Sequence, residues 1–266
     1  MLNWTLYKKG MKSNLLIIVI FMAILTLYTS VMVSMYNPTA MKTLNDFFNT
    51  MPQIMKMVGM TAGSTTLLGF LTTYLYGFIY LVFPLIFSIL CANKLVAKYV
   101  DNTSMSSLVA APVKRSTIIF TQIKVLLTGV FILIAYSTLL EIIISQATFP
   151  GDLDIPRLLI LNLGLLALHM FLASICFIFS CVFSDTKNSI GWGAGIPALM
   201  FVLQMMANAG GNAANAKYFT AFTLFNPTEI VAWTPFYLWA IGILAFASIV
   251  IYFASVEIFV AKDLNI

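Results

Sequence analysis

Residues 67–90 read LLGFLTTYLYGFIYLVFPLIFSIL, an unbroken run of 24 residues that contains no charged side chain. A helix needs roughly 20 mostly apolar residues to cross about 30 Å of membrane hydrocarbon. Within lipid the backbone must satisfy its own hydrogen bonds, which a helix does. Five other runs have the same character, so we predict six transmembrane helices, at residues 15–35, 67–90, 118–145, 158–183, 190–207 and 236–260.

The composition of the whole chain agrees with a membrane protein. Hydrophobic residues make up 61% of its 266 residues and charged residues 9%, whereas soluble domains carry about 25% charged residues. The longest gap between predicted spans, residues 36–66, has 31 residues, which is too few for a separate soluble domain. We therefore expect residues 1–266 to form a single all-α membrane domain.

Lysine and arginine residues are distributed unequally between the two sides of the predicted bundle. If the N-terminus lies inside, ten are on the inner side and four on the outer side, and cytoplasmic loops normally carry the excess. The inner set is Lys8, Lys9, Lys12, Lys94, Lys98, Lys114, Arg115, Lys124, Lys187 and Lys262, and the outer set is Lys42, Lys56, Arg157 and Lys217. Both termini are therefore expected in the cytoplasm. The net charge of +5 reflects this bias rather than nucleic-acid binding.

The chain contains no recognisable catalytic or cofactor motif. It lacks the G-x-x-x-x-G-K-[ST] phosphate loop, the H-E-x-x-H metal motif and the G-x-S-x-G nucleophile turn. Its single histidine, His169, cannot build a histidine-based metal site. Cys91, Cys176 and Cys181 fall at the inner face, where disulfides are rare, so we expect them to be buried as small apolar side chains. The chain is predicted to be no enzyme and to hold no cofactor.

Three ionisable side chains are candidates for lining a pathway through the membrane, because such groups are costly in lipid and often functional. Glu141 lies near the outer end of the third span, where it either reaches the outer water or lines the pathway. His169 falls near the middle of the fourth span, where it either bonds a neighbouring helix as a neutral side chain or faces the pathway. Glu229, between the fifth and sixth spans, is the third candidate.

Proline, glycine and methionine mark further features. Pro84 is expected to kink the second span. Gly191 and Gly195 are four residues apart, a spacing that permits close helix approach. Residues 226–236 contain two prolines and are expected to form a re-entrant pair of half-helices on the outer side. Residues 41–60 show methionine-rich helical spacing, which predicts an amphipathic outer helix that either offers an adaptable surface or simply packs on the span ends.

The loop between the second and third spans, residues 91–117, reads CANKLVAKYVDNTSMSSLVAAPVKRST. It carries two short apolar stripes of helical spacing, separated by a polar turn at residues 101–104. Pro112 ends the second stripe, and Lys114 and Arg115 follow it. Such a loop is either a docking helix for a soluble partner or an inert, positively charged connector.

The run LVAKYVDNTSMSSLVAAPVKRSTIIFTQIKV resembles the corresponding loop of type-2 ABC exporter permeases, whose usual form is lv-x-E/D-x-x-x-G-T-x-x-x-L-L-s-x-P-V-s-R. The positions that match are Asp101, Thr103, Leu108, Pro112, Val113 and Arg115. The chain departs from the pattern at Asn102, where glycine is common, and at Lys114, where serine is common. The closing run EIFVAKDLNI is similar to the frequent F-x-r-r-D-l ending of the same family.

This resemblance implies a six-span permease subunit of an exporter in the bacterial plasma membrane. The loop would be a cytoplasmic coupling helix that docks on a separate ATP-binding subunit, and ATP and Mg would bind to that partner. The residues implied in docking are Asp101, Thr103, Met105, Leu108, Pro112, Lys114 and Arg115. The permease would pair with a second copy, and the re-entrant segment would close the pathway. The chain also resembles peptide-exporting members, such as the staphylococcal phenol-soluble modulin exporters, which implies an amphipathic peptide as cargo.

The alternative function is a self-sufficient secondary transporter or channel that needs no ATPase partner. Inverted repeats and pairs of intramembrane charges would favour it. Neither is found in the sequence.

Overall fold

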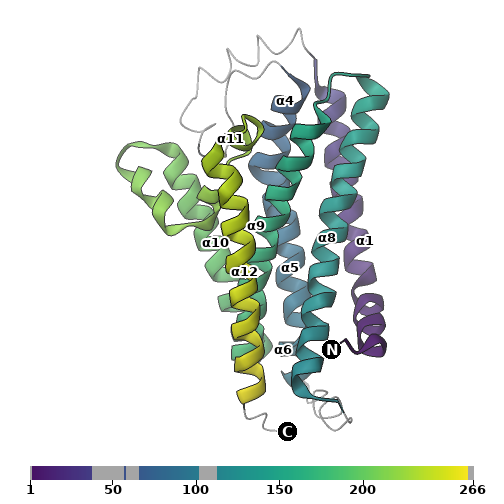
Figure 1. Ribbon diagram of the computed structural model, residues 1–266, viewed down its shortest axis with the longest axis vertical. Helices are drawn as coiled ribbons and strands as arrows, with labels where there is room; N and C mark the ends of the chain where they lie inside the picture. Colours follow the sequence, from purple (N-terminus) through teal and green to yellow (C-terminus); the bar gives the residue numbers. More distant parts are fainter. Residues whose placement is uncertain (1, 38–56, 58–65, 102–112, 263–266) are drawn as a thin grey trace.

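The computed structural model describes residues 2–37, 57, 66–101 and 113–262, and within these ranges it contains helices and turns but no strand (Figure 1). The prediction of six helices long and apolar enough to cross a membrane is confirmed. They are Trp4–Met35, Leu67–Asp101, Arg115–Thr148, Ile155–Val182, Thr186–Ala209 and Pro235–Ala261. Apart from Met57, the expected outer helix at 41–60 lies outside the described residues, and so do Thr103, Met105, Leu108 and Pro112.

Several helices are longer than their apolar runs because polar residues cap them. The helix α1 (Trp4–Met35) begins where the Asn3 side chain accepts a hydrogen bond from the backbone N–H of Leu6. The helix α8 covers Arg115–Thr148, and α9 (Ile155–Val182) begins at the cap Asp154. Such caps satisfy N–H groups that the first helical turn leaves free. α1 thus begins at residue 4 rather than 15, α8 at 115 rather than 118, and α9 at 155 rather than 158.

The second span is not a uniform α-helix. It consists of α4 (Leu67–Tyr74), a π-helical turn η1 (Leu75–Ile79), α5 (Tyr80–Leu95) and the short α6 (Ala97–Asp101). Pro84 lies inside α5 and has no N–H, so it cannot bond the carbonyl of Tyr80 four residues earlier. The π-helical turn η1 lies immediately before Tyr80.

The chain beyond α9 is built differently. The helix α10 (Thr186–Ala209) is capped by Asp185, whose carboxylate accepts the backbone N–H of Asn188 at 2.8 Å. This bond lowers the pKa of the Asp185 carboxyl. After Gly210, whose φ of 80° favours glycine, come the 3₁₀-helices η2 (Gly211–Phe219) and η3 (Ala221–Leu224). The helices α11 (Pro227–Val231) and α12 (Pro235–Ala261) follow.

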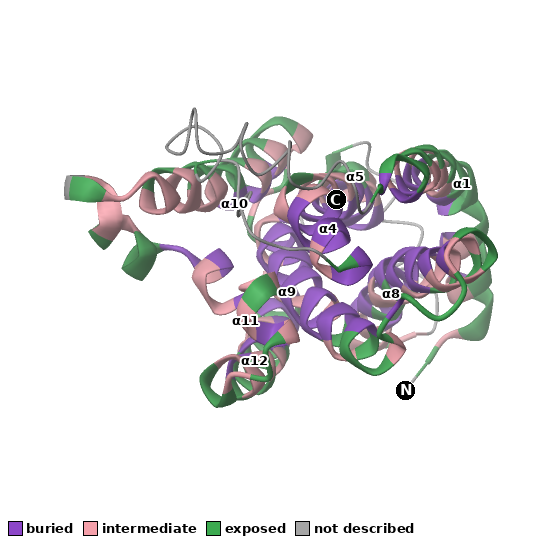
Figure 2. Cartoon of the chain, turned by 90° about the horizontal axis from the view of Figure 1, so that it is seen from above, coloured by how far each residue is buried: buried purple, intermediate pink, exposed green. Residues whose placement is uncertain are grey.

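The bundle is organised around α9, as the view from above shows (Figure 2). α9 packs against α5, α8, α10, α11 and α12, while α1 packs mainly on α8. Buried residues concentrate in α9, the second span and the facing side of α8, whereas α10 and α12 lie at the periphery. The start of α1, the end of α12, α6 and the start of α8 all lie at one end of the bundle, opposite α4 and α11 (Figure 1).

Glycine permits close packing at Gly129 and Gly10, and not at the place that the sequence suggested. A Cβ atom built on Gly129 of α8 would lie 2.5 Å from the ring of Phe87 in α5. The predicted pair Gly191 and Gly195 has no described neighbouring atom within 4 Å of such a Cβ. The close approach that their spacing permits is therefore not used among the described residues.

The three cysteines behave as predicted from the sequence. Cys91, Cys176 and Cys181 are all free and buried. The thiol of Cys176 lies 3.2 Å from the carbonyl oxygen of Gly193 and joins α9 to α10.

Candidate functional site

A polar cluster lies in the core of the bundle, where three spans meet. Tyr76 projects from the π-helical turn η1, and its hydroxyl donates to Oε2 of Glu141 in α8 at 2.8 Å. Nδ2 of Asn162 in α9 donates to the Tyr76 hydroxyl oxygen at 2.7 Å and lies 3.4 Å from Glu141 Oε2. The three side chains are buried. Together they bond the second, third and fourth spans to one another.

Glu141 does not reach the outer water, so that interpretation of the sequence was wrong. Its side chain is 0% exposed, because it lies on the side of α8 that faces η1 and α9. Its second oxygen, Oε1, is buried and has no hydrogen-bond partner among the described residues. A buried carboxyl group with an unsatisfied oxygen is costly, and Glu141 is the one acidic side chain among the buried residues of the described part of the chain.

His169 bonds a neighbouring helix, as one of its two interpretations predicted. Its Nε2 lies 2.7 Å from the backbone carbonyl oxygen of Tyr80. A carbonyl oxygen can only accept, so Nε2 carries the hydrogen. This is the carbonyl that Pro84 leaves without a partner inside α5. The imidazole therefore replaces the missing helical hydrogen bond, a substitution that an apolar environment requires.

Tyr80 links these two arrangements and extends them to the first span. Its hydroxyl lies 2.7 Å from the hydroxyl of Thr29 in α1. Its ring packs edge-on against that of Tyr76, with the ring centroids 5.0 Å apart. A connected set of buried polar groups thus joins four spans through the side chains of Thr29, Tyr80, Tyr76, Glu141, Asn162 and His169.

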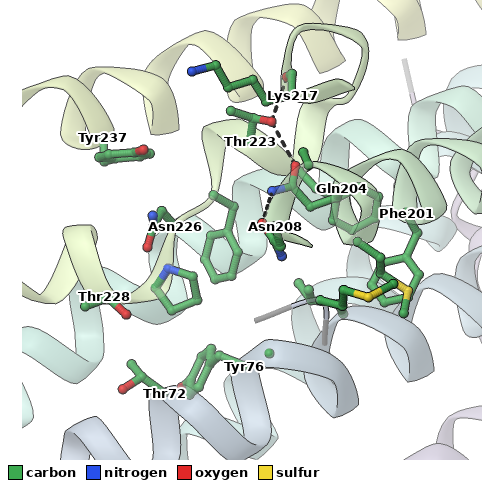
Figure 3. A pocket seen from close by; sticks show the side chains of 18 residues that line it. Thr72, Tyr76, Phe201, Gln204, Asn208, Lys217, Thr223, Asn226, Thr228 and Tyr237 are labelled. Carbon is green, nitrogen blue, oxygen red and sulfur yellow. Dashed lines mark hydrogen bonds between the residues drawn. The ribbon is translucent and has the colours of Figure 1, made fainter. Parts of the chain in front are cut away.

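A pocket with a volume of about 340 Å³ lies beside this cluster, towards the end of the bundle that carries α4 and α11. Its walls come from α4 and η1 on one side and from α10, η2, η3, α11 and α12 on the other (Figure 3). Its polar lining residues are Thr72, Tyr76, Gln204, Asn208, Lys217, Thr223, Asn226, Thr228 and Tyr237. Phe201, Phe222 and Phe225 supply much of its apolar wall.

Hydrogen bonds fix part of the polar wall of the pocket. Gln204 Nε2 donates to Asn208 Oδ1 at 2.9 Å, and the Thr223 hydroxyl lies 2.8 Å from Gln204 Oε1 (Figure 3). The side-chain oxygen of Asn226 accepts the backbone N–H of Glu229 at the start of α11. The side-chain amide oxygens of Gln204, Asn208 and Asn226 thus accept hydrogen bonds from other groups of the chain. The pocket combines aromatic rings with amide and hydroxyl groups, so it suits a ligand that is partly apolar and partly hydrogen-bonding.

Tyr76 belongs to both features, since its ring lines the pocket while its hydroxyl bonds Glu141. Glu229, in contrast, does not join the cluster. Its Oε2 accepts a hydrogen bond from the hydroxyl of Thr234 at 2.7 Å and stabilises the turn between α11 and α12. The pathway role suggested for Glu141, His169 and Glu229 stays a prediction.

At the opposite end of the bundle, two residues assigned to partner docking make contacts within the chain. Oδ2 of Asp101 lies 3.4 Å from the backbone nitrogen of Thr186, the first residue of α10. Nη1 of Arg115 donates to the backbone carbonyl of Lys262, just past α12, at 3.1 Å. Lys262 in turn donates to the carbonyls of Cys181 and Val182 at the end of α9. Lys114 is exposed.

Sequence reasoning missed Tyr76, Tyr80, Asn162 and Thr29 as members of the cluster. One signal was present, because Tyr76, Tyr80 and Pro84 follow one another at four-residue spacing, about one helical turn, in an otherwise apolar run. Asn162 was a second signal, as an amide inside a span needs a partner.

No protein-family model, curated protein or solved structure matches this chain.

Proposed function

We propose that this chain is the transmembrane permease subunit of an ATP-driven ABC exporter that moves an amphipathic or hydrophobic substrate out of the cell. The observation that carries the proposal is a pair of contacts between the predicted coupling loop and helices that line the pocket. The loop that resembles a coupling helix is attached at both ends to spans that line the pocket at the far end of the bundle.

The first attachment involves α10. Asp101, the last residue of α6 and the first of the predicted docking residues, contacts the first residue of α10, Thr186. The same helix lines the pocket with Phe201, Gln204 and Asn208 near its other end. An α-helix of 24 residues is about 36 Å long, so displacement of the loop would be carried along α10 to the pocket.

The second attachment involves α12. Arg115, at the end of the loop, bonds the carbonyl of Lys262, and Tyr237 in the first turn of α12 lines the pocket. Both attachments therefore act on the same wall of the pocket, whereas α4 and η1 form the opposite wall. A movement of the loop would therefore change the distance between the wall formed by α4 and η1 and the wall formed by α10 and α12.

In this proposal the energy comes from a separate ATP-binding subunit, which binds ATP and Mg. Closure of that subunit on nucleotide would favour one arrangement of the permease over another, since a ligand shifts an equilibrium by its differential affinity for two states. A second copy of the permease would complete the transporter. α11 and the turn at Trp233 would form the re-entrant closure on the outer side.

The pocket supports an amphipathic peptide as the class of substrate. Its aromatic residues can take apolar side chains, and its amide and hydroxyl groups can bond a peptide backbone. In the proposed orientation, with both termini in the cytoplasm of a bacterium, the pocket lies on the outer side and would hold cargo before release.

Two measurements test this proposal. The tagged chain, purified from its native cells in mild detergent, should retain an ABC ATP-binding subunit, and a chain that never retains one would contradict the proposal. Single cysteines introduced at Ser106 and Asn212 should react with an impermeant thiol reagent from opposite sides of the membrane. Labelling of both from the same side would contradict the topology.

A secondary transporter is the second candidate, and the buried carboxyl of Glu141 favours it, since intramembrane carboxyl groups occur in ion-coupled carriers. Transport by the purified chain alone in liposomes, driven by an ion gradient and unaffected by ATP, would support this alternative over the first.

A further inference from the structure

Glu141 is an acidic side chain buried among transmembrane helices without a basic partner in the described part of the chain. From the second span the uncharged Tyr76 bonds it, and from α9 the uncharged Asn162. The uncharged Tyr80 packs on the ring of Tyr76, and the cluster member on α1, Thr29, bonds Tyr80. His169 bonds the carbonyl of Tyr80 and is not hydrogen-bonded to the carboxyl group. The one ion pair within the described ranges joins exposed Asp154 and Arg157.

The hydrogen bonds around Glu141 distinguish its two oxygen atoms. Oε2 accepts from Tyr76 at 2.8 Å, with Asn162 as a second, longer donor at 3.4 Å. Oε1 has no partner in the described structure, and the amide oxygen Oδ1 of Asn162 is equally without one. Both are acceptors when Glu141 is ionised. The site therefore holds more acceptors than donors, and one added proton corrects that imbalance.

The free-energy cost of burying a charge also favours a protonated Glu141. An ionised carboxylate in an apolar interior requires a cation or several strong donors to offset its lost hydration. One tyrosine hydroxyl and one long amide contact are few for that task, and every atom of the Glu141 side chain is shielded from solvent. A carboxylic acid needs neither a cation nor further donors, and proteins do keep such acids neutral in apolar sites.

The position of Tyr76 gives this proton a structural consequence. Tyr76 lies in the π-helical turn η1, and its ring forms part of the pocket wall. Its hydroxyl is the link between that wall and the two helices α8 and α9. π-helical turns within α-helices are frequent at functional sites, and the hydroxyl of Tyr76 joins this one to α8 and α9.

We propose that Glu141 is a proton-binding site, and that the protonated triad Glu141–Tyr76–Asn162 is a latch that holds the η1 wall of the pocket against α8 and α9. Loss of the proton places an unpaired charge in the core. Water must then enter between η1 and α8 to solvate it, and the latch opens. The proposal is independent of the energy source assigned above, because it concerns this chain alone.

The first test is infrared spectroscopy of the full chain in nanodiscs at neutral pH. A protonated carboxyl group gives a C=O stretching band that an ionised one lacks. We expect this band in the wild type, its loss in Glu141→Gln, and its retention in Glu257→Gln, which removes an exposed carboxyl near the inner end of α12. Absence of the band in the wild type, or its loss in Glu257→Gln, would overturn the proposal.

A second variant covers the case in which Glu141→Gln does not fold. Tyr76→Phe keeps the carboxyl group but removes its donor, so the same band should shift to higher frequency, as expected when a hydrogen bond to the acid is lost. An unshifted band would show that Tyr76 does not bond the acid and would contradict the latch.

The third readout is thermal unfolding between about pH 5 and about pH 9. The folded chain holds a proton that the unfolded chain releases above about pH 4.3, so stability should fall as the pH rises. The melting temperature of the wild type should therefore decrease relative to that of Glu141→Gln, while Glu257→Gln follows the wild type. Equal pH dependence of wild type and Glu141→Gln would refute proton binding. Stabilisation of the wild type alone by added sodium would identify a bound cation instead. Neither ATPase activity nor transport enters these tests.

Discussion

The consecutive spans α9 and α10 differ sharply in how the bundle uses them. Of the most apolar stretch of each helix, 67% is buried in α9 and only 11% in α10. α9 supplies Asn162 and His169 to the polar core. α10 exposes Trp192 and Leu199, and hydrogen bonds join its N-terminal half to α9 through Gly193 and Ser189.

This difference separates a frame from a movable wall. The frame consists of α1, the second span, α8 and α9, which buried polar bonds and interlocked aromatic rings join to one another. The wall consists of α10 and the short helices that follow it, and it lines one side of the pocket. Regions with few buried contacts are those that move at low cost. The two regions should therefore respond differently to matched substitutions.

The largest difference is expected from glycine substitutions. Gly129→Leu should prevent proper packing of α8 on α5, because even a Cβ atom there would lie 2.5 Å from the Phe87 ring. Overpacking of a core costs about 1–3 kcal/mol and occasionally more, and a whole leucine side chain in this contact should reach the upper part of that range. Gly195→Leu on α10 meets open space and should leave the melting temperature nearly unchanged. Equal losses in both variants, measured by thermal unfolding in detergent, would remove the distinction between frame and wall.

The next effect concerns the bond that joins α9 to the second span. His169→Ala leaves the Tyr80 carbonyl without a partner, which should cost about 1–3 kcal/mol. Pro84→Ala restores a backbone N–H that can bond this carbonyl within α5. The double variant should therefore lose less stability than the sum of the two single variants. Strict additivity in a double-mutant cycle would show that the histidine does not compensate for the proline.

A smaller effect is expected where the loop attaches to the peripheral helices. Arg115→Ala removes the bond to the Lys262 carbonyl, while Lys114→Ala removes a neighbouring exposed charge. If the attachment transmits movement, Arg115→Ala should lower substrate-stimulated ATPase activity of the assembled transporter about tenfold, the equivalent of about 1.4 kcal/mol. Lys114→Ala should change it less. The reverse order would favour surface docking of both residues over internal attachment.

The smallest effect is expected in the pocket wall itself. Gln204→Ala removes one amide that bonds Asn208 and Thr223, and a single such hydrogen bond contributes about 0.5–1.5 kcal/mol. If the chain is the exporter proposed above, substrate export should fall about two- to tenfold without a change in the amount of protein in the membrane. Trp239→Ala, on the exposed face of α12, serves as the control. Loss of export in the control alone would place the substrate elsewhere.

The candidate site was predictable only in part. Glu141 and His169 stand out in the sequence, because ionisable residues in a span need an explanation. Their partners did not stand out, since tyrosine, asparagine and threonine are common enough in spans to pass without notice. A docking role for Asp101 and Arg115 is predicted from the sequence pattern, but the pattern could not show that their side chains would contact α10 and the end of α12.

The sequence by itself determined that residues 67–90 and five similar runs become helices, because lipid leaves the backbone no other way to satisfy its hydrogen bonds. It could not determine which helix lies at the centre, since α9 and α10 are both apolar enough to span a membrane. Only the tertiary structure decided that. It placed His169 against the carbonyl freed by Pro84, and Tyr76 between Glu141 and Asn162. The physical reason is that apolarity is a property of each segment, whereas the pairing of buried polar groups depends on which segments meet.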